Sequence, residues 1–202
     1  MRIPSVADRV VHTALALTIG PVLDAQFEPS SFGYRPGRSV SQAVQAIEAY
    51  RDAGYWHVVD ADIEDFFDTV DHDRLMAKLT AAFPEERQLT DLISEILAHQ
   101  AQQTGCAAAK GLAQGSPLSP LMANLYLDAL DETLSQGGIK LVRFADDFVL
   151  LCKKQSRAED ALNLAAKELA AEGLKLNRDK SRVSDFSKGF TFLGHMLSLI
   201  HI

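Results

Sequence analysis

The sequence lacks several features that would each point to a particular class of protein. Its 20 lysines and arginines are outnumbered by 27 aspartates and glutamates, which gives a net charge of −7. This balance excludes a simple sequence-independent nucleic-acid-binding protein, because such proteins are basic. The two cysteines, Cys106 and Cys152, follow no metal-ligand spacing and suggest no disulfide framework, so we expect a reducing cytoplasm.

Repeats, low-complexity linkers and membrane spans are also missing. No apolar run approaches the roughly 20 residues that cross a bilayer. The N-terminal MRIPSVADRV is charged and broken by proline, unlike a signal peptide. We therefore expect no membrane partner. The 47% hydrophobic and 23% charged residues are typical of an ordinary globular protein with one domain or two small lobes.

Apolar spacing and capping residues predict a series of helices. Ser5-x-x-Asp8 begins the first helix, which Gly20-Pro21 ends after Ile19. The other predicted helices are one from Ser39-x-x-Gln42 to near Gly54, one over roughly 73–82, one following Pro84, one over 121–134 and one begun by Ser156-x-x-Glu159 that runs through Glu172.

Predicted strands alternate with these helices. WHVVDADI at 56–63 is β-branched and apolar, and LVRFADDFVLLC at 141–152 forms two strands joined at its aspartates. LKLN and FTFLGHML are further strand candidates. The order strand, helices, hairpin, helix and strand predicts an α+β fold, with helices packed on one face of a largely antiparallel sheet.

Three carboxylates on two of these strands carry the candidate chemistry. Alternation of side chains places Asp60 and Asp62 on one face of the first strand, while the hairpin exposes Asp146 and Asp147 at its tip. If the strands are neighbours, Asp62 converges with the aspartate pair, and divalent cations would compensate the like charges. Hard oxygen ligands suit Mg²⁺ or Mn²⁺, and a two-metal carboxylate site suits phosphoryl transfer. Taken alone, the aspartate pair is better explained as a solvated turn.

Five blocks occur in the order of the palm motifs of reverse transcriptases. They are VVDADIEDFFDTVDH, GLAQGSPLSPLMANLYLDALD, RFADDFVLL, GLKLNRDKS and FTFLGH. Upstream, RIPSVADRVVH and FGYRPGRSVSQAV resemble the fingers motifs of the bacterial group II intron-like lineage. The resemblance covers the chain to about Leu197 and implies a right-hand polymerase with a ferredoxin-like palm. It implies partial fingers at 1–55, a palm with the catalytic motifs at 56–197 and an abrupt tail at 198–202.

The resemblance also implies a catalytic apparatus. Asp62 and Asp146 would be the principal ligands of two Mg²⁺ ions, with Mn²⁺ as an alternative, and Asp147 would lie beside them. The backbone carbonyl of Ile63 would be a further ligand. One ion would activate the primer 3′-hydroxyl, and the other would hold the incoming triphosphate and stabilise the leaving pyrophosphate. Lys180 lies where the family has a lysine near the triphosphate; from the residues alone, a solvated surface lysine is the commoner case.

Further contacts with substrate follow from the resemblance. Phe67 matches the steric gate that selects dNTPs, and the Gln114-Gly115 pair matches a nucleotide-binding turn. The expected nucleic-acid contacts are Arg35 and Arg38 on the template and Phe192, Leu193 and Gly194 in the strand that grips the primer. The residues alone leave an alternative open in each case. Phe67 could be a core aromatic and Gln114-Gly115 an ordinary turn. The two arginines could simply flank a loop, and FTFLGH could be a plain core strand.

The chain departs from the family pattern in three places. Its catalytic box is Phe-Ala-Asp-Asp, where tyrosine is commoner at the first position, but both carboxylates remain. The basic stretch that relatives carry before this point is missing, and Arg2 matches it poorly. Nothing after FTFLGH resembles a thumb, and LSLIHI is an abrupt apolar ending. We therefore expect a piece of a longer protein, one that by itself binds primer-template weakly.

Within the lineage, QGSPLSPLMANLYLDALD and RFADDFVLLCKKQSRAEDAL look most like reverse transcriptases encoded with CRISPR adaptation genes. That branch implies spacer acquisition from RNA in antiviral defence, with an RNA template, a DNA primer, dNTPs and a spacer integrase as partners. The alternatives are a group II intron-encoded reverse transcriptase and maturase, and a catalytically inactive RNA-binding relative. A nucleotide cyclase, like the inactive relative, is ranked well below a polymerase, because FADDF is not the glycine-glycine-acid-acid-phenylalanine hairpin of a cyclase.

Overall fold

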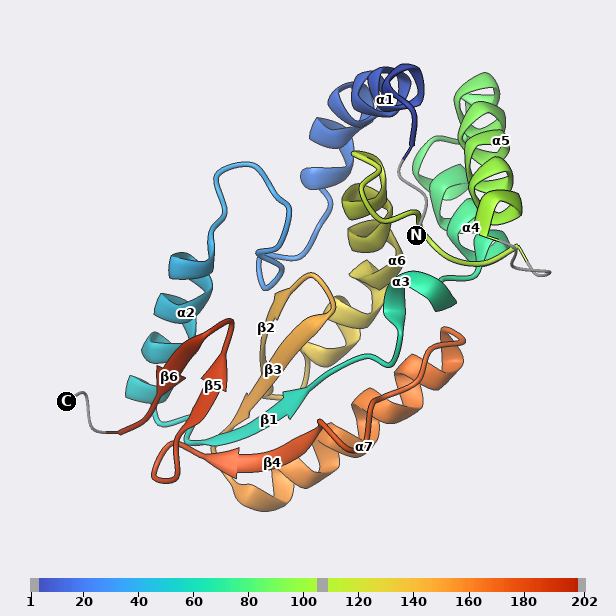
Figure 1. The fold of residues 1–202 in the computed structure, drawn as a ribbon. Coiled ribbons are helices and arrows are strands. Elements are labelled where there is room, and N and C mark those ends of the chain that lie inside the picture. Colours follow the sequence, from blue (N-terminus) through green and yellow to red (C-terminus); the bar gives the residue numbers. More distant parts are fainter. Residues whose placement is uncertain (1–3, 105–108, 200–202) are drawn as a thin grey trace. The chain divides into compact units, whose positions relative to one another are not determined.

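Helices and strands alternate along the chain in a computed structural model that describes residues 4–104 and 109–199 (Figure 1). The helices are α1 (Val6–Asp24), α2 (Val40–Asp52), α3 (Phe66–Thr69), α4 (His72–Ala82), α5 (Arg87–Thr104), α6 (Ser119–Leu134) and α7 (Gln155–Ala171). The strands are β1 (His57–Ala61), β2 (Lys140–Phe144), β3 (Asp147–Cys152), β4 (Arg182–Asp185), β5 (Phe190–Phe192) and β6 (His195–Leu197). The predicted α+β class is confirmed, and so is the order of strand, helices, hairpin and helix from β1 to α7.

The main sheet is antiparallel and has the strand order β2-β3-β1-β4. In the β1–β3 pair, Val59 lies opposite Leu150 and Ala61 lies opposite Phe148. The end of β1 is therefore adjacent to the start of β3, where the hairpin from β2 turns. β5 and β6 form a separate two-stranded sheet.

Side chains from both faces of the main sheet are buried. One face carries Val58, Val142, Val149 and Leu151, which pack in one cluster with α2 and with the β5–β6 hairpin. The opposite face carries Val59 and Leu150, which are also fully buried, and α7 contacts β1, β3 and β4. The prediction placed helices on one face of the sheet only. The structure covers both faces, because α2 and the β5–β6 hairpin pack on the face of Val58.

The chain forms two compact units that are interleaved in sequence. We call Met1–Phe27 with Asp65–Asp128 the helical unit, and Glu28–Glu64 with Ala129–Ile202 the sheet unit. The boundary between fingers and palm that the motifs predict at residue 55 lies inside the sheet unit, so it does not coincide with a boundary between the two units. The assignment of fingers and palm stays a prediction.

Two predicted helix ends differ from the structure. α1 continues through Gly20 and Pro21 to Asp24, because Ile19 and Leu23 on the last turns are buried and packing outweighs the missing proline N–H. α7 begins at Gln155, and its N-cap Lys154 makes no side-chain cap bond, so the capping box expected at Ser156 does not form. The caps at Ser5 and Ser39 are present as predicted.

The strand predictions after residue 173 need correction. LKLN is not a strand: it pairs with the chain after β1 only through an isolated bridge between Ile63 and Leu176. FTFLGHML is two strands, since Leu193 and Gly194 both have positive φ, at +50° and +80°, and form a tight hairpin turn. β4 and the four-residue α3 are missing from the sequence-based prediction.

The helix α1 is long and apolar enough to cross a membrane, judged by length and composition alone. A single helix of this kind is weak evidence, because core helices of water-soluble proteins meet the same criterion. Cys106 and Arg2 lie outside the described residues, as does the end of the expected tail from residue 200. Cys152 is a buried free thiol.

Leu151 offers a test of the sheet core. It is fully buried in the cluster that α2 covers, so Leu151→Ala removes packed methyl groups and leaves a cavity. The free energy of unfolding should fall by about 2–5 kcal/mol, measured by urea denaturation. Leu92→Ala is the control, since Leu92 is 41% exposed on α5 and should change stability by about 0.5 kcal/mol or less. Equal losses for the two variants would contradict this core.

Candidate active site

The β2–β3 hairpin carries the aspartate pair at its turn. Phe144 pairs with Asp147, which leaves Ala145 and Asp146 as the two turn residues. Ala145 has a φ of +60°, a conformation that L residues adopt only when the surrounding structure holds them there. Asp146 is half-buried and Asp147 is exposed.

Asp62 lies beside this turn, in the same sheet unit. It follows Ala61, the last paired residue of β1, whose partner on β3 is Phe148. One residue further along this register, Asp62 is level with Asp147. Because side chains alternate, Asp60, Asp62 and Asp147 lie on the same face of the sheet. The structure therefore brings together the carboxylates at the two strand ends, which are far apart in sequence.

Burial and the neighbouring charges both raise the pKa values of the carboxylates at the turn. Loss of hydration raises the pKa of Asp147 to about 6, and the neighbouring charges of Asp146, Asp62 and Asp60 add to the rise. Loss of hydration also raises the pKa of Asp146, with Asp62 again contributing. Like charges this close are unfavourable without a compensating cation.

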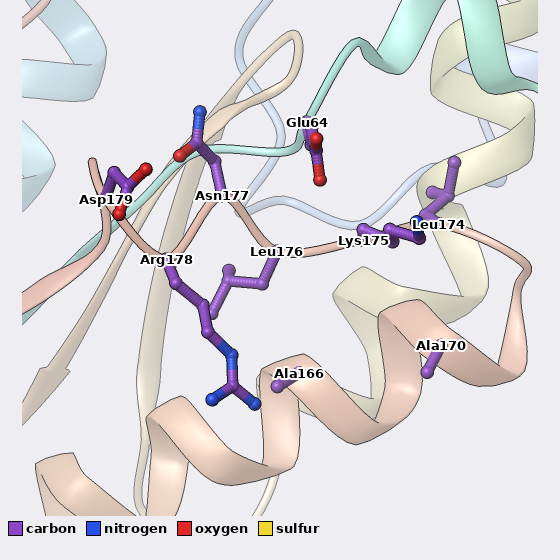
Figure 2. Close-up of a pocket in the computed structure, with 9 residues that line it drawn as sticks. All are labelled: Glu64, Ala166, Ala170, Leu174, Lys175, Leu176, Asn177, Arg178 and Asp179. Atoms are coloured by element: carbon purple, nitrogen blue, oxygen red, sulfur yellow. The ribbon is translucent and has the colours of Figure 1, made fainter.

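The loop between α7 and β4 holds Asp62. The side-chain amide of Asn177 donates to Asp62 Oδ2 at 3.0 Å, and the Lys180 ammonium lies 3.2 Å from the same oxygen. The backbone N–H of Asp62 donates to Ser181 Oγ at 3.2 Å. Figure 2 shows Asn177 pointing away from α7, whereas Arg178 points toward that helix over an open pocket of about 430 Å³. Asn177 thus connects the loop to the carboxylate site.

Lys180 is the cation that pairs with Asp62 in this loop, and 67% of its side chain is exposed. An exposed ion pair of this kind contributes little to stability. Its ammonium is therefore available for another anion, although its predicted contact with a triphosphate stays a prediction. Asp60 is paired with Arg182 at 3.5 Å, and burial raises the pKa of Asp60 despite that partner.

The carbonyl of Ile63 was the fourth predicted metal ligand. Ile63 forms an antiparallel bridge with Leu176, but the flanking hydrogen bonds join Asn177 N–H to Asp62 C=O and Glu64 N–H to Lys175 C=O. The bridge is therefore of the kind in which the paired residues exchange no bonds, and it leaves the Ile63 carbonyl unused.

The fit of this site to divalent cations is a matter of donor chemistry. Within the described residues, no group of three or more His, Cys, Asp and Glu side chains is arranged to hold a metal ion. The Asp62 carboxylate is turned to Asn177 and Lys180 instead. The donor set nevertheless fits Mg²⁺ or Mn²⁺, because clustered carboxylates supply the hard oxygen ligands that these cations prefer.

The predicted nucleotide-binding residues lie in the helical unit. Phe66 is buried against Tyr126, with ring centroids 6.4 Å apart, whereas Phe67 is partly exposed. Phe66 is therefore the core aromatic of the pair and Phe67 the accessible one. Gln114 and Gly115 are exposed, and Gly115 has a φ of +84° that favours glycine.

His12 contacts the residue that follows the Gln114-Gly115 turn. His12 is buried on α1, and its Nδ1 lies 3.0 Å from the hydroxyl oxygen of Ser116, the residue after Gly115. That hydroxyl also accepts the N–H of Leu118 at 3.4 Å. The turn is thereby tied to α1 within the helical unit.

The predicted nucleic-acid contacts lie in the sheet unit and take part in internal contacts. Arg35 is 9% exposed and donates to the carbonyls of Glu28 and Ser31, so little of it remains for a phosphate. Arg38 donates to the Pro29 carbonyl. Contacts of both arginines with a template stay predictions.

The predicted primer-grip residues form the tip of the β5–β6 hairpin. Phe192 is 3% exposed, and Leu193 packs against the same cluster. Gly194 is exposed at the turn. The side chains of Phe192 and Leu193 thus belong to the core, as the alternative interpretation of FTFLGH proposed, and a primer contact by this hairpin stays a prediction.

Sequence reasoning missed the residues that support the site. Asn177 stands three positions before Lys180 in the NRDKS block and could have been found as an amide in a motif loop. His12 sits on a largely apolar helix, and a buried imidazole needs a partner. Ser181 ends the same block and Arg182 follows it, but their partners are separated from them by more than 100 residues.

The antiparallel sheet, the carboxylates at its strand ends and the motif order agree with the comparison with known families. The family model described as "Reverse transcriptase (RNA-dependent DNA polymerase)" matches residues 1–197. The chain belongs to this reverse transcriptase family, as its motifs predicted.

Individual relatives place it near group II intron-encoded proteins. Protein YkfC of Escherichia coli is 28% identical over 96% of this chain and 62% of its own length. The group II intron-encoded protein LtrA of Lactococcus lactis is 29% identical over 70% of this chain and 24% of its own length. Among solved structures, apo telomerase of Candida tropicalis truncated from its C-terminal domain has a TM-score of 0.69 at 15% identity, covering 92% of this chain and 43% of that one. That likeness shows the shared fold.

The burial of His12 generates a pH prediction. Burial lowers the pKa of His12 below its ordinary value of 6.5, so the unfolded chain binds the proton more readily. The stabilising effect of neutral His12 is present above about pH 6.5 and is lost as the pH falls through the lowered folded-state pKa. In the wild type, the thermal unfolding temperature should therefore fall as the pH is lowered below about 6.5. The drop should be smaller in His12→Asn, whose amide can reach Ser116.

His195→Gln is the matched control, because His195 is exposed on β6. It should keep the wild-type pH dependence. The same slope in all three proteins would show that His12 does not carry it.

Proposed function

We propose that this chain is the catalytic part of an RNA-directed DNA polymerase that works by two-metal nucleotidyl transfer. The observation that carries the proposal is the meeting of Asp62 with the Asp146–Asp147 turn at one end of an antiparallel sheet. Family membership supports the reaction class. Because the chain spans 62% of YkfC and 24% of LtrA, the activity of the whole protein is part of the proposal.

The carboxylates would hold two Mg²⁺ ions, or Mn²⁺ in their place, with the Ile63 carbonyl as a further ligand. The ions supply Lewis-acid activation of the primer hydroxyl and stabilisation of the leaving pyrophosphate. Asp62 would leave Lys180 when the ions bind, and the exposed Lys180 would then be free to pair with the triphosphate. Asn177 and Ser181 keep the Asp62 backbone in place during this exchange.

The helical unit supplies the proposed substrate selection. Phe67, the accessible member of its aromatic pair, would exclude a ribose 2′-hydroxyl by steric contact and so select dNTPs. Gln114 would hydrogen-bond the nucleotide or the template, with Gly115 allowing close backbone approach. His12 would hold that turn through Ser116.

The proposed biological role is spacer acquisition from RNA alongside a CRISPR spacer integrase in the cytoplasm. The support is the resemblance of the blocks around Gln114 and Asp146 to that branch. The second candidate is an intron-encoded polymerase and maturase, which the relationship to LtrA favours. Sequencing the neighbouring genes separates them: an adjacent integrase supports the first, and a surrounding group II intron supports the second.

The carboxylate pair generates the first functional prediction. Asp146→Asn with Asp147→Asn should abolish primer extension on an RNA template with Mg²⁺, with a loss of about 1,000-fold or more, because the acceptors for the ions lose their charge. The thermal unfolding temperature without metal should stay equal or rise, since mutual repulsion is removed.

The matched control is Glu159→Gln with Asp160→Gln, which removes the same charge from an exposed site on α7. This control should extend primers at the wild-type rate. Equal incorporation by the wild type and the Asp146, Asp147 double variant would refute the catalytic assignment.

Phe67→Ala tests the steric gate. Incorporation of rNTPs relative to dNTPs should rise by about tenfold or more, because the ring no longer excludes the 2′-hydroxyl. Phe67→Tyr keeps the ring and should retain the wild-type ratio. Single-nucleotide extension kinetics with paired dNTP and rNTP measure both, and an unchanged ratio in Phe67→Ala would remove Phe67 from this role.

A further inference from the structure

One buried arginine connects the catalytic turn to the end of a helix. Arg143 on β2 is 1% exposed. Its Nε and Nη2 donate to the two carboxylate oxygens of Asp131 on α6, at 2.7 and 2.5 Å. Its third guanidinium nitrogen, Nη1, donates to the backbone carbonyl of Ala145 at 2.8 Å. All three residues belong to the sheet unit.

The Ala145 carbonyl is a sensitive point of the site. It belongs to the same planar peptide group as the N–H of Asp146, so fixing this carbonyl fixes the plane from which the Asp146 side chain departs. Ala145 also holds the positive φ of +60°, which its neighbours must maintain. A guanidinium is suited to this task, because its rigid fork can bind a carboxylate with two nitrogens and a carbonyl with the third.

The turn is held from a second direction by the loop that precedes α2. The Arg143 N–H donates to the Ser30 carbonyl at 2.9 Å, and the Phe32 N–H donates to the Arg143 carbonyl at 2.8 Å. Beyond Phe32, the loop passes so close that a Cβ on Gly33 would lie 2.3 Å from the Ala145 nitrogen. Only glycine fits there without moving the turn.

We propose that Arg143, fixed by Asp131, is a positioning residue for catalysis, and that Gly33 lets the loop before α2 pack directly against the turn. Together, Arg143 and Gly33 set the orientation of Asp146 and Asp147 without touching substrate. This inference rests on the proposed function, since it assigns a role in that same reaction. It also gives the FGYRPGR block a purpose inside the protein: its backbone packs on the catalytic hairpin.

If the ion pair had a purely structural role, replacing it would leave kcat unchanged as long as the protein stayed folded. Buried ion pairs can often be replaced by apolar residues of similar volume with little loss of stability, whereas removing one partner is strongly destabilising. The double variant Asp131→Leu with Arg143→Met therefore keeps a packed interior but removes the bond to Ala145. Arg143→Lys keeps the charge beside Asp131 but lacks the fork that reaches both partners.

The experiment uses the full-length protein and measures primer extension at a temperature well below unfolding. For both variants, kcat should fall by about 10- to 100-fold, since a small displacement of reacting groups has an effect of this size. The KM for dNTP should change little, because substrate contacts are untouched. Removal of the exposed pair Arg87 and Asp91 on α5 as Arg87→Gln with Asp91→Asn is the control and should leave kcat unchanged.

Gly33 is tested separately. Gly33→Ala should lower kcat in the same way, because the new methyl group displaces the Ala145 backbone. Gly37→Ala is matched to it: this glycine lies in the same loop with a φ of +71° and nothing within 4 Å of an added Cβ. It strains the loop without touching the turn, so its kcat should stay at the wild-type value.

A readout that does not depend on activity completes the test. Amide hydrogen exchange, followed by mass spectrometry, should be faster over residues 143–148 in the Arg143 variants and in Gly33→Ala, with β1 unchanged. Wild-type kcat and wild-type exchange in the folded double variant would overturn the positioning role.

The two proposals fail in different ways. If the wild type extends primers and the Asp146, Asp147 double variant does not, while the Arg143 variants match the wild type, only the positioning role fails. If the wild type and the aspartate double variant incorporate nucleotides equally, the proposed function fails. Faster amide exchange at the turn in the Arg143 variants would then show that Arg143 restrains the turn, but not for catalysis.

Discussion

Repulsion between carboxylates crowded at one end of a sheet is the constraint on which this structure depends. Loss of hydration raises the pKa of Asp147 to about 6, and the neighbouring charges of Asp146, Asp62 and Asp60 add to the rise. A fold gains no stability from such an arrangement. The arrangement is therefore best understood as a site prepared for positive charge from outside the chain, and the rest of the sheet unit holds it in place.

Two sets of contacts oppose that repulsion. On the β1 side, the loop before β4 grips Asp62 through Asn177, Lys180 and Ser181. On the hairpin side, the turn is held by a buried guanidinium and by close backbone packing. Both sets join segments that are distant in sequence, and both act on the backbone or on Asp62, so the Asp146 and Asp147 side chains stay at the end of the sheet where the hairpin turns. Rigidity of the backbone and accessibility of the charges are thus combined.

Sequence reasoning succeeded where the information was local or carried by ordered motifs. Alternation along WHVVDADI placed Asp60 and Asp62 on one face, and the caps at Ser5 and Ser39 began helices as expected. It failed where tertiary packing decided, as in the continuation of α1 through Pro21 and the splitting of FTFLGHML at Leu193. Asn177 stands out as an amide in a motif loop, but its bond to Asp62, 115 positions away, depends on how the loop after α7 packs beside β1, and no local pattern shows this.

The central claim is that Asp62 and the hairpin aspartates serve one cluster of divalent ions. The most direct measurement is anomalous diffraction from crystals of the full-length protein with primer-template, a non-reactive dNTP analogue and Mn²⁺. The account predicts Mn²⁺ bound by Asp62 and Asp146, with Asp147 beside them and Asp62 released from Lys180. Asp62 still paired with Asn177 and Lys180 in the complete complex, with no anomalous density at the hairpin, would contradict it.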